Sequence, residues 1–229
     1  MARLTWHGHA TFTLETDAGT RVLFDPFLDD NPVSDIRAAG IDRLDYVLCS
    51  HGHFDHFADA VSIAKRTGAM VVGTFELVSF AQSQGAPRGH GMNVGGGHRF
   101  EGLGYVKLTP ALHTGTIAGD VAGAHTSTPH GFWIDLGGKR LYHCGDSALI
   151  TDMQLLRGQV DVALLPIGDN FTMGPEDAAR AVEFIEPRVV IPMHYDTWDL
   201  IAQDPQAFRS RVGARADVVI LKPGESYDF

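Results

Sequence analysis

Short apolar runs alternate with amphipathic segments along most of this sequence. The runs are rich in β-branched residues and are bounded by turn-forming residues, which is typical of buried strands. They cover residues 46–49, 70–73, 105–108, 132–136, 160–165, 189–191 and 218–221. Near the start, residues 4–6 and 11–15 predict a hairpin, and residues 21–24 predict a strand that follows it.

Apolar residues recur at helical spacing in four other segments, which cover residues 57–66, 75–84, 175–185 and 205–211. The last two segments begin at Pro175 and Pro205, and proline suits the first turn of a helix. Apolar strands that alternate with amphipathic helices predict an α/β domain in which helices cover the sheets.

Length and composition favour a single domain over residues 1–229. The chain is 44% hydrophobic, and no low-complexity segment divides it. Its 18 Lys and Arg residues against 28 Asp and Glu give a net charge of −10, without the basic face that nucleic-acid binding requires. We therefore expect a small-molecule substrate and no nucleic-acid partner, while assembly into a homo-oligomer is left open.

Two further features predict a cytoplasmic protein with no membrane partner. The sequence has no apolar leader, and none of its runs approaches the ~18 apolar residues of a membrane helix. Cys49 and Cys144 are too few for a disulfide-stapled scaffold of this size. We expect both thiols to be free and to pack as small hydrophobic groups.

The densest chemical signal is the segment His51-Gly52-His53-Phe54-Asp55-His56. It follows an apolar strand and precedes a predicted helix, and most of its side chains are metal-ligand types. Imidazole and carboxylate groups are the ligands that hydrolytic zinc, manganese and iron sites use. The alternative interpretation is a polar loop that happens to be rich in histidine.

Three more candidate ligands each follow a predicted buried strand: His113 follows residues 106–110, Asp146 follows residues 141–145, and His194 follows residues 189–193. Functional groups of α/β proteins gather in the loops beyond one end of such strands. Taken singly, a His or Asp beyond a strand is more often a cap, a turn residue or a satisfied polar group than a ligand. Together with the histidine cluster, they predict a metal centre that is assembled from four strand ends.

This ligand pattern resembles the metallo-β-lactamase superfamily, in which His-x-His-x-Asp-His is followed by a distant His, an Asp and a His. The likeness covers nearly the whole chain. More narrowly, the sequence is similar to metal-dependent hydrolases related to ascorbate-6-phosphate lactonase and N-acyl-phosphatidylethanolamine phospholipase D. The narrower likeness is carried by residues 6–10, 24–27, 90–96, 164–168, 170–173 and 191–195. The resemblance implies a four-layer αββα sandwich.

The resemblance also implies a dinuclear metal centre. Six side chains are assigned to one metal each: His51, His53 and His113 to the first, and Asp55, His56 and His194 to the second. Asp146 is expected to bridge the two ions. Zinc is the preferred metal, with manganese and iron as alternatives.

Differences between this sequence and particular members of the superfamily argue against some of the activities found among those members. Dinuclear zinc β-lactamases carry a cysteine at the position of Asp146, which disfavours antibiotic hydrolysis. Oxygen-reducing diiron relatives usually carry Glu at the position of His53, which argues against a redox role. Members that cut RNA usually have an added domain or a basic arm, and neither fits in this length.

The expected function is hydrolysis of a small ester, lactone or phosphodiester by a hydroxide bound to two metal ions. Asp55 is the expected catalytic residue, because its carboxylate can orient the hydroxide or carry its proton. Two other classes of function stay open at this point: a metal-binding protein without turnover, and metal-assisted oxidation.

Asp25 closes the apolar strand that precedes the histidine cluster. We expect it to accept a hydrogen bond from the non-ligating nitrogen of a metal histidine, since such histidines nearly always have this kind of partner. The alternative role is that of a turn residue before Pro26.

Four more residues are candidates for the substrate pocket. His9 and His90 lie in segments that resemble the hydrolase family, although neutral histidines bonded to the backbone would look the same. Asp169 and Asn170 lie in a polar loop before the helix at Pro175, and a plain connecting loop is the alternative.

Overall fold

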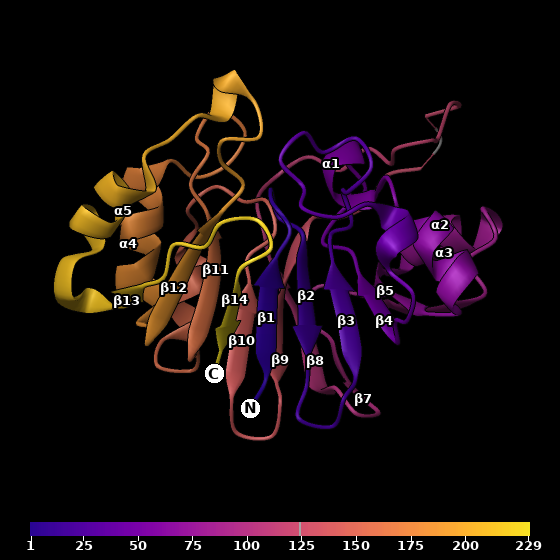
Figure 1. Ribbon diagram of the computed structural model, residues 1–229, viewed down its shortest axis with the longest axis horizontal. Helices are drawn as coiled ribbons and strands as arrows, with labels where there is room; N and C mark the ends of the chain where they lie inside the picture. The colour runs from indigo at the N-terminus through magenta and orange to yellow at the C-terminus, as the bar shows by residue number, and fades with distance from the viewer. Residues whose placement is uncertain (124) are drawn as a thin grey trace.

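Two mixed β-sheets face one another in the computed structural model, which describes residues 1–123 and 125–229 (Figure 1). The first sheet has the strand order β14-β1-β2-β3-β4-β5-β6 and the second β13-β12-β11-β10-β9-β8-β7. The first consists of β1 (Arg3–Trp6), β2 (Phe12–Glu15), β3 (Arg21–Phe24), β4 (Tyr46–Leu48), β5 (Met70–Thr74), β6 (Arg88–Met92) and β14 (Ser226–Asp228). The second consists of β7 (Gly97–Phe100), β8 (Gly104–Pro110), β9 (His130–Asp135), β10 (Arg140–His143), β11 (Val162–Pro166), β12 (Val189–Met193) and β13 (Asp217–Val218).

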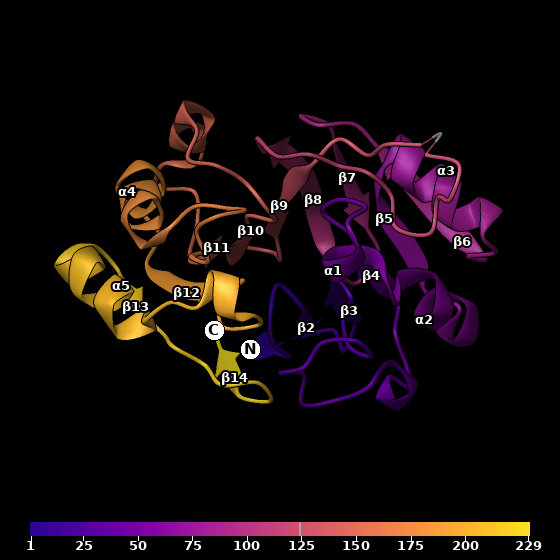
Figure 2. The ribbon, with the colours of Figure 1, turned by 90° about the horizontal axis from the view of Figure 1, so that it is seen from above.

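Helices cover the outer face of each sheet. They are α2 (Ala60–Thr67), α3 (Phe75–Ser83), α4 (Pro175–Ile185) and α5 (Pro205–Val212). The short helix α1 (Phe54–Phe57) lies beyond the strand ends instead (Figure 1), and short 3-10 turns occur at Ala38–Gly40, Thr151–Leu156, Asp199–Ile201 and Gly213–Arg215. Seen from above, α2 and α3 lie on one side of the sheets and α4 and α5 on the other (Figure 2). The predicted αββα sandwich is therefore confirmed.

The alternating direction of side chains along each strand explains why each sheet packs against helices on one face and against the other sheet on the other. Val47 and Val71 pack in the core beneath α2 and α3. Leu48 and Val72, the next residues, belong to the core that the two sheets share. Successive side chains of a strand point to opposite faces, so apolar residues at every position bury both faces of the sheet.

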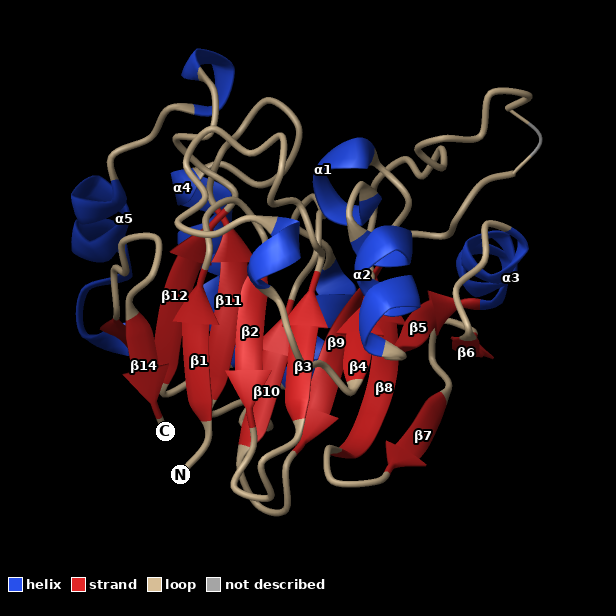
Figure 3. Cartoon of the chain, turned by 45° about the vertical axis from the view of Figure 1, so that its right-hand side comes forward, coloured by secondary structure: helices blue, strands red, loops and turns tan. Residues whose placement is uncertain are grey.

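The direction of the strands determines where polar groups gather. Strands β3, β4 and β5 are mutually parallel, and so are β10, β11 and β12. Two antiparallel steps make β1 run with β3, and two more make β8 run with β10. The carboxyl ends of these strands lie at the end of the molecule that carries α1, opposite the two chain termini (Figure 3).

The structure differs from the predicted elements in several places. The helix expected over 57–66 begins at Ala60 as α2, and α1 is a separate turn before it, because the Asp59 N–H donates to the Pro26 carbonyl at 3.1 Å and so does not continue the helical bonds of α1. The strand expected over 218–221 is shortened to β13. Strands β6, β7 and β14 were not predicted, since edge strands need backbone partners but no apolar alternation. None of the described helices is both long and apolar enough to cross a membrane.

Candidate metal centre

Ends of parallel strands deliver most of the candidate side chains to one place. His9 follows β1, Asp25 follows β3, His51 follows β4, His113 follows β8, Asp146 follows β10 and His194 follows β12. The turn after His51 and helix α1 add His53, Asp55 and His56. Neither sheet alone supplies the set, so the site exists only because the two sheets pack together.

The backbone at these strand ends is unusual. His9, Asp25 and His194 have φ angles of 53°, 43° and 55°, in the left-handed region that non-glycine residues seldom adopt. Each such residue costs on the order of 1–3 kcal/mol unless surrounding contacts hold it, and such strain concentrates at functional sites. A Cβ at Gly52 would lie 2.8 Å from the side chain of Ile117, so glycine lets the loop after His113 pass close to the cluster.

His51, His53 and His113 form the first group of converging ligand atoms. Nδ1 of His53 lies 3.0 Å from Nε2 of His51 and 3.3 Å from Nε2 of His113. Tetrahedral nitrogen ligands on a zinc ion are about 3.4 Å apart, as follows from zinc–nitrogen bonds of about 2.1 Å. The three nitrogens are therefore spaced as ligands of one ion would be.

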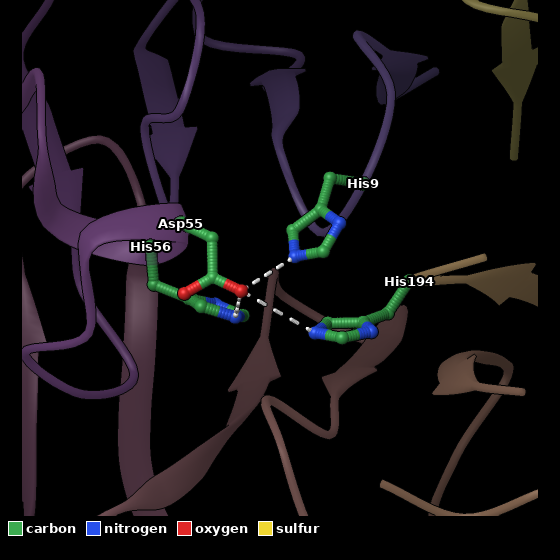
Figure 4. Close-up of side chains that lie close together, drawn as sticks. All are labelled: His9, Asp55, His56 and His194. Atoms are coloured by element: carbon green, nitrogen blue, oxygen red, sulfur yellow. Dashed lines mark hydrogen bonds and ion pairs between the residues drawn. The ribbon is translucent and has the colours of Figure 1, made fainter. Parts of the chain in front are cut away.

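Asp55, His56 and His194 form a second group, which His9 joins (Figure 4). Oδ2 of Asp55 lies 3.0 Å from Nε2 of His9, 3.7 Å from Nε2 of His194 and 3.8 Å from Nε2 of His56. Nδ1 of His9 lies 2.8 Å from the Thr197 hydroxyl, which is placed to donate to it. His9 is thus placed to donate from Nε2 to Asp55, and it does not line the open cavity.

Asp146 lies between the two groups. Its Oδ2 is 3.1 Å from Nε2 of His194 and 3.3 Å from Nε2 of His56, in the second group. The same oxygen is 3.6 Å from Nε2 of His113 and 4.0 Å from Nε2 of His51, in the first. One carboxylate therefore faces ligand atoms of both groups.

The site is buried, and its charges respond to that burial. Burial opposes ionisation of Asp146, but the neighbouring His194 and His56 outweigh it and hold the pKa of this carboxyl well below its usual range. Burial lowers the pKa of His194, but the Asp146 charge and the hydrogen bonds to Asp146 and Asp55 together outweigh burial and raise that pKa to about 9. Burial also lowers the pKa of His9 to about 3, so this ring is neutral near pH 7. A cation would displace the proton of His194, because metal ligands must be deprotonated.

Unpartnered atoms test whether these residues fit a metal. Among the described residues, Nε2 of His56, Nε2 of His194 and Oδ1 of Asp146 are buried without a hydrogen-bond partner. Native proteins seldom bury such atoms unsatisfied, and a bound ion can satisfy them. Lone pairs of nitrogen and oxygen that converge in a buried site are also the donor set of divalent transition metals. The residues therefore fit a metal centre.

Asp25 orients the histidine cluster through hydrogen bonds to His56 and Ser50. Its Oδ2 lies 2.9 Å from Nδ1 of His56, which directs Nε2 of that ring towards Asp146. Its Oδ1 accepts the Ser50 backbone N–H at 2.6 Å, and its Oδ2 accepts the Ser50 hydroxyl at 2.6 Å. The Ser50 oxygen in turn lies 3.1 Å from Nδ1 of His51. One carboxylate thus orients a histidine of each group, and Ser50, which sequence reasoning missed, connects it to His51.

His90 does not line the site. It lies on β6, an edge strand of the first sheet, where its ring packs against His98 at a tilt of 31° with centroids 4.2 Å apart and meets Phe100 at 5.0 Å. Edge-strand pairing places it there, and His90 is not among the residues that line the cavity beside the candidate ligands, so the structure does not support its pocket role.

Asp169 and Asn170 also lie away from the candidate ligands. Both are exposed and have positive φ angles, and the carbonyl of Asp169 accepts the N–H of Thr172 in a tight turn. This turn directs Asp169 towards the start of α4, where it lines a different hollow with Pro175. The substrate-pocket role considered for the two residues is not supported; the next residue, Phe171, reaches the cavity instead.

A cavity of about 530 Å³ opens onto the candidate ligands. Its floor contains His53, Asp55, His113 and Asp146. Its remaining lining consists of Thr114 and the apolar residues Phe54, Phe171, Trp198 and Leu200. The sequence patterns assigned no role to these apolar residues, although Phe54 lies within the histidine cluster and Phe171 within a segment that resembles the hydrolase family.

Comparison with known proteins agrees with this geometry. The family model described as a β-lactamase superfamily domain matches residues 3–194. The chain is 47% identical to a UPF0173 metal-dependent hydrolase of Pelotomaculum thermopropionicum, over 99% of this chain and 100% of the relative. It is 44% identical to a UPF0173 metal-dependent hydrolase of Staphylococcus aureus, again over 99% of this chain and 100% of the relative.

A solved structure extends the comparison. Igni18, a metallo hydrolase from the hyperthermophilic archaeon Ignicoccus hospitalis, superposes with a TM-score of 0.88 at 35% identity, over 100% of this chain and 99% of Igni18. The match covers both sheets and the loops that carry the histidines. The chain therefore belongs to the metallo-β-lactamase superfamily, within the UPF0173 family, and is a metal-dependent hydrolase.

Proposed function

We propose that the centre binds two divalent metal ions and that the protein cleaves a small ester, lactone or phosphodiester. The observation that carries the proposal is the position of Asp146, whose Oδ2 faces nitrogens of both histidine groups within 4.0 Å. Two ions held about 3.5–4 Å apart would lower the pKa of a shared water, supply a hydroxide nucleophile near neutral pH and polarise the bond under attack.

The residues divide their roles by position. His51, His53 and His113 would hold one ion, and Asp55, His56 and His194 the other. Asp146 would contact both. Zinc suits this mixture of imidazole and carboxylate, with manganese and iron as alternatives.

Asp55 has a further role because it lines the cavity. In this proposal its carboxylate would orient the attacking water, accept its proton and then pass that proton to the leaving group. His9, bonded to Oδ2 of Asp55 at 3.0 Å, keeps that carboxylate in position. The substrate would be a small molecule, since the cavity volume lies within the usual range of ~300–1,000 Å³ for ligand sites.

Metal analysis coupled to variants tests the proposal. After reconstitution, elemental analysis of the wild-type protein should approach two equivalents of metal per chain. Asp146→Ala should fall to one equivalent or fewer, because each ion loses a ligand. His98→Ala, which removes an exposed histidine outside the site, should still bind two.

A reproducible wild-type limit below one equivalent would contradict the dinuclear assignment. Slow metal exchange with no hydrolysis of phosphodiesters, lactones or thioesters would instead favour a metal-binding protein without turnover. Oxygen consumption by the iron form would favour metal-assisted oxidation.

A further inference from the structure

The mouth of the metal cavity is apolar on several sides. Phe54 comes from α1, Phe171 from the loop between β11 and α4, and Trp198 and Leu200 from the segment between β12 and α5. Phe54, Phe171 and Leu200 are 55%, 50% and 62% exposed, which is high for large apolar side chains. Exposed apolar groups that gather in one place on a soluble protein usually mark a binding site.

Part of this apolar wall is anchored to the protein core. The Trp198 ring lies 5.9 Å from Phe54 and 6.0 Å from Phe27, measured between ring centroids. Phe27 is almost fully buried and also meets Phe54 at 5.7 Å. The wall is therefore a preformed surface beside the candidate ligands, which favours binding of a rigid or extended apolar group.

Cationic side chains are missing from the described lining of this cavity. The charged groups there are Asp55 and Asp146, and both are committed to the metal centre. A phosphate or carboxylate on the part of a substrate remote from the reacting bond would lose its water against Phe171 and Trp198 without gaining a partner. Burying an unpaired charge in this way is strongly unfavourable.

We infer that the substrate is an uncharged ester or lactone whose non-reacting part is an apolar acyl or aryl group that packs against Phe54, Phe171, Trp198 and Leu200. This inference rests on the proposed hydrolytic function and selects within it. It excludes a phosphorylated lactone as the preferred substrate, because no lysine or arginine among the described lining residues would pair with the phosphate.

A series of p-nitrophenyl esters tests the chain-length dependence. With zinc-loaded protein, kcat/KM should rise from acetate through butyrate to octanoate, by up to about fourfold for each methylene that becomes buried. An ester of the same length that ends in a carboxylate should be hydrolysed at least about 10-fold less efficiently than its neutral counterpart. Equal rates along the series, or a preference for the charged ester, would overturn the inference.

Matched variants locate the effect at the wall. Phe171→Ala should lower kcat/KM for the octanoate about 10-fold, while the acetate changes by about twofold or less. Phe75→Ala is the control, because Phe75 is a comparably exposed phenylalanine that does not line this cavity. Leu200→Arg should shift the ratio of charged to neutral ester hydrolysis towards the charged ester by about 10-fold.

A binding measurement separates failure of this inference from failure of the proposed function. Calorimetry should detect 2-decanone, which cannot be hydrolysed, and should find weaker binding of a keto acid of equal length. Phe171→Ala should weaken ketone binding, and Phe75→Ala should not. Ketone binding without hydrolysis of any ester would show that Phe171 and its neighbours bind apolar groups, but it would refute the proposed function and with it the assignment of an ester or lactone substrate. Hydrolysis with preference for charged esters, or absence of ketone binding, would refute the inference alone.

Discussion

The floor and the mouth of the cavity are built in different ways. The floor is polar and mostly buried, and its side chains are fixed by contacts such as the 2.9 Å bond between Asp25 and His56. The mouth is apolar and half exposed, and its side chains come from connecting segments. The difference indicates that reaction chemistry and substrate choice reside in separate parts of the site, so variants should affect one with little effect on the other.

We expect the largest loss of activity from a substitution in the floor of the cavity. Asp55→Ala removes the carboxylate that faces both the cavity and His194, so turnover should fall by about 10²–10⁴-fold. The free energy of unfolding should fall by much less than the activation free energy of the reaction rises, because the hydrophobic core is untouched. Steady-state kinetics and denaturant unfolding measure the two quantities. Parental activity in the variant with its full metal content would refute the catalytic role of Asp55.

We expect the next largest change, a loss of metal affinity, from a substitution of Asp25, which orients the histidines of the floor. Asp25→Asn keeps the shape of the side chain but weakens acceptance from Nδ1 of His56, so metal affinity should fall by about 10- to 100-fold. Competition with a chromogenic chelator measures this affinity. Unchanged affinity would mean that Asp25 acts only as a turn residue before Pro26.

Ser50 should contribute less than Asp25. Ser50→Ala removes one contact to His51 and one to Asp25, but the backbone N–H of residue 50 still binds Asp25. We expect metal affinity to fall by about 10-fold, at the lower end of such effects. If the same chelator assay gave a loss as large as that of Asp25→Asn, the hydroxyl would be as important as the carboxylate.

We expect the smallest changes in stability and metal content from a substitution in the mouth of the cavity. Leu200→Ser changes an exposed side chain, so the free energy of unfolding should change by about 0.5 kcal/mol or less. Metal content should stay the same, because the Leu200 side chain has no atom that can coordinate a metal. Thermal unfolding and elemental analysis check both points. Loss of metal in this variant would show that the floor and the mouth are not independent.

Local patterns predicted much of the fold. Most strands of both sheets and helices α3, α4 and α5 were predicted to within a few residues, because buried strands and amphipathic helices leave a periodic record in the sequence. The division between α1 and α2 left no such record, since it depends on the Asp59 N–H donating to the Pro26 carbonyl, a residue far away in the sequence. The edge strands β6 and β7 were missed because Gly-rich, polar strands lack alternation.

The sequence by itself determined which ligand types stand at the ends of which strands, because the cluster from His51 to His56 is contiguous and each later candidate follows an apolar run. Only the tertiary structure decided which of these residues meet. In the fold, His9 contacts Asp55 although the two residues are 46 positions apart in the sequence. His90 lies at a sheet edge, and Phe171 and Trp198 line the cavity. Periodicity reports burial and local conformation, whereas these contacts depend on how two separate sheets pack face to face.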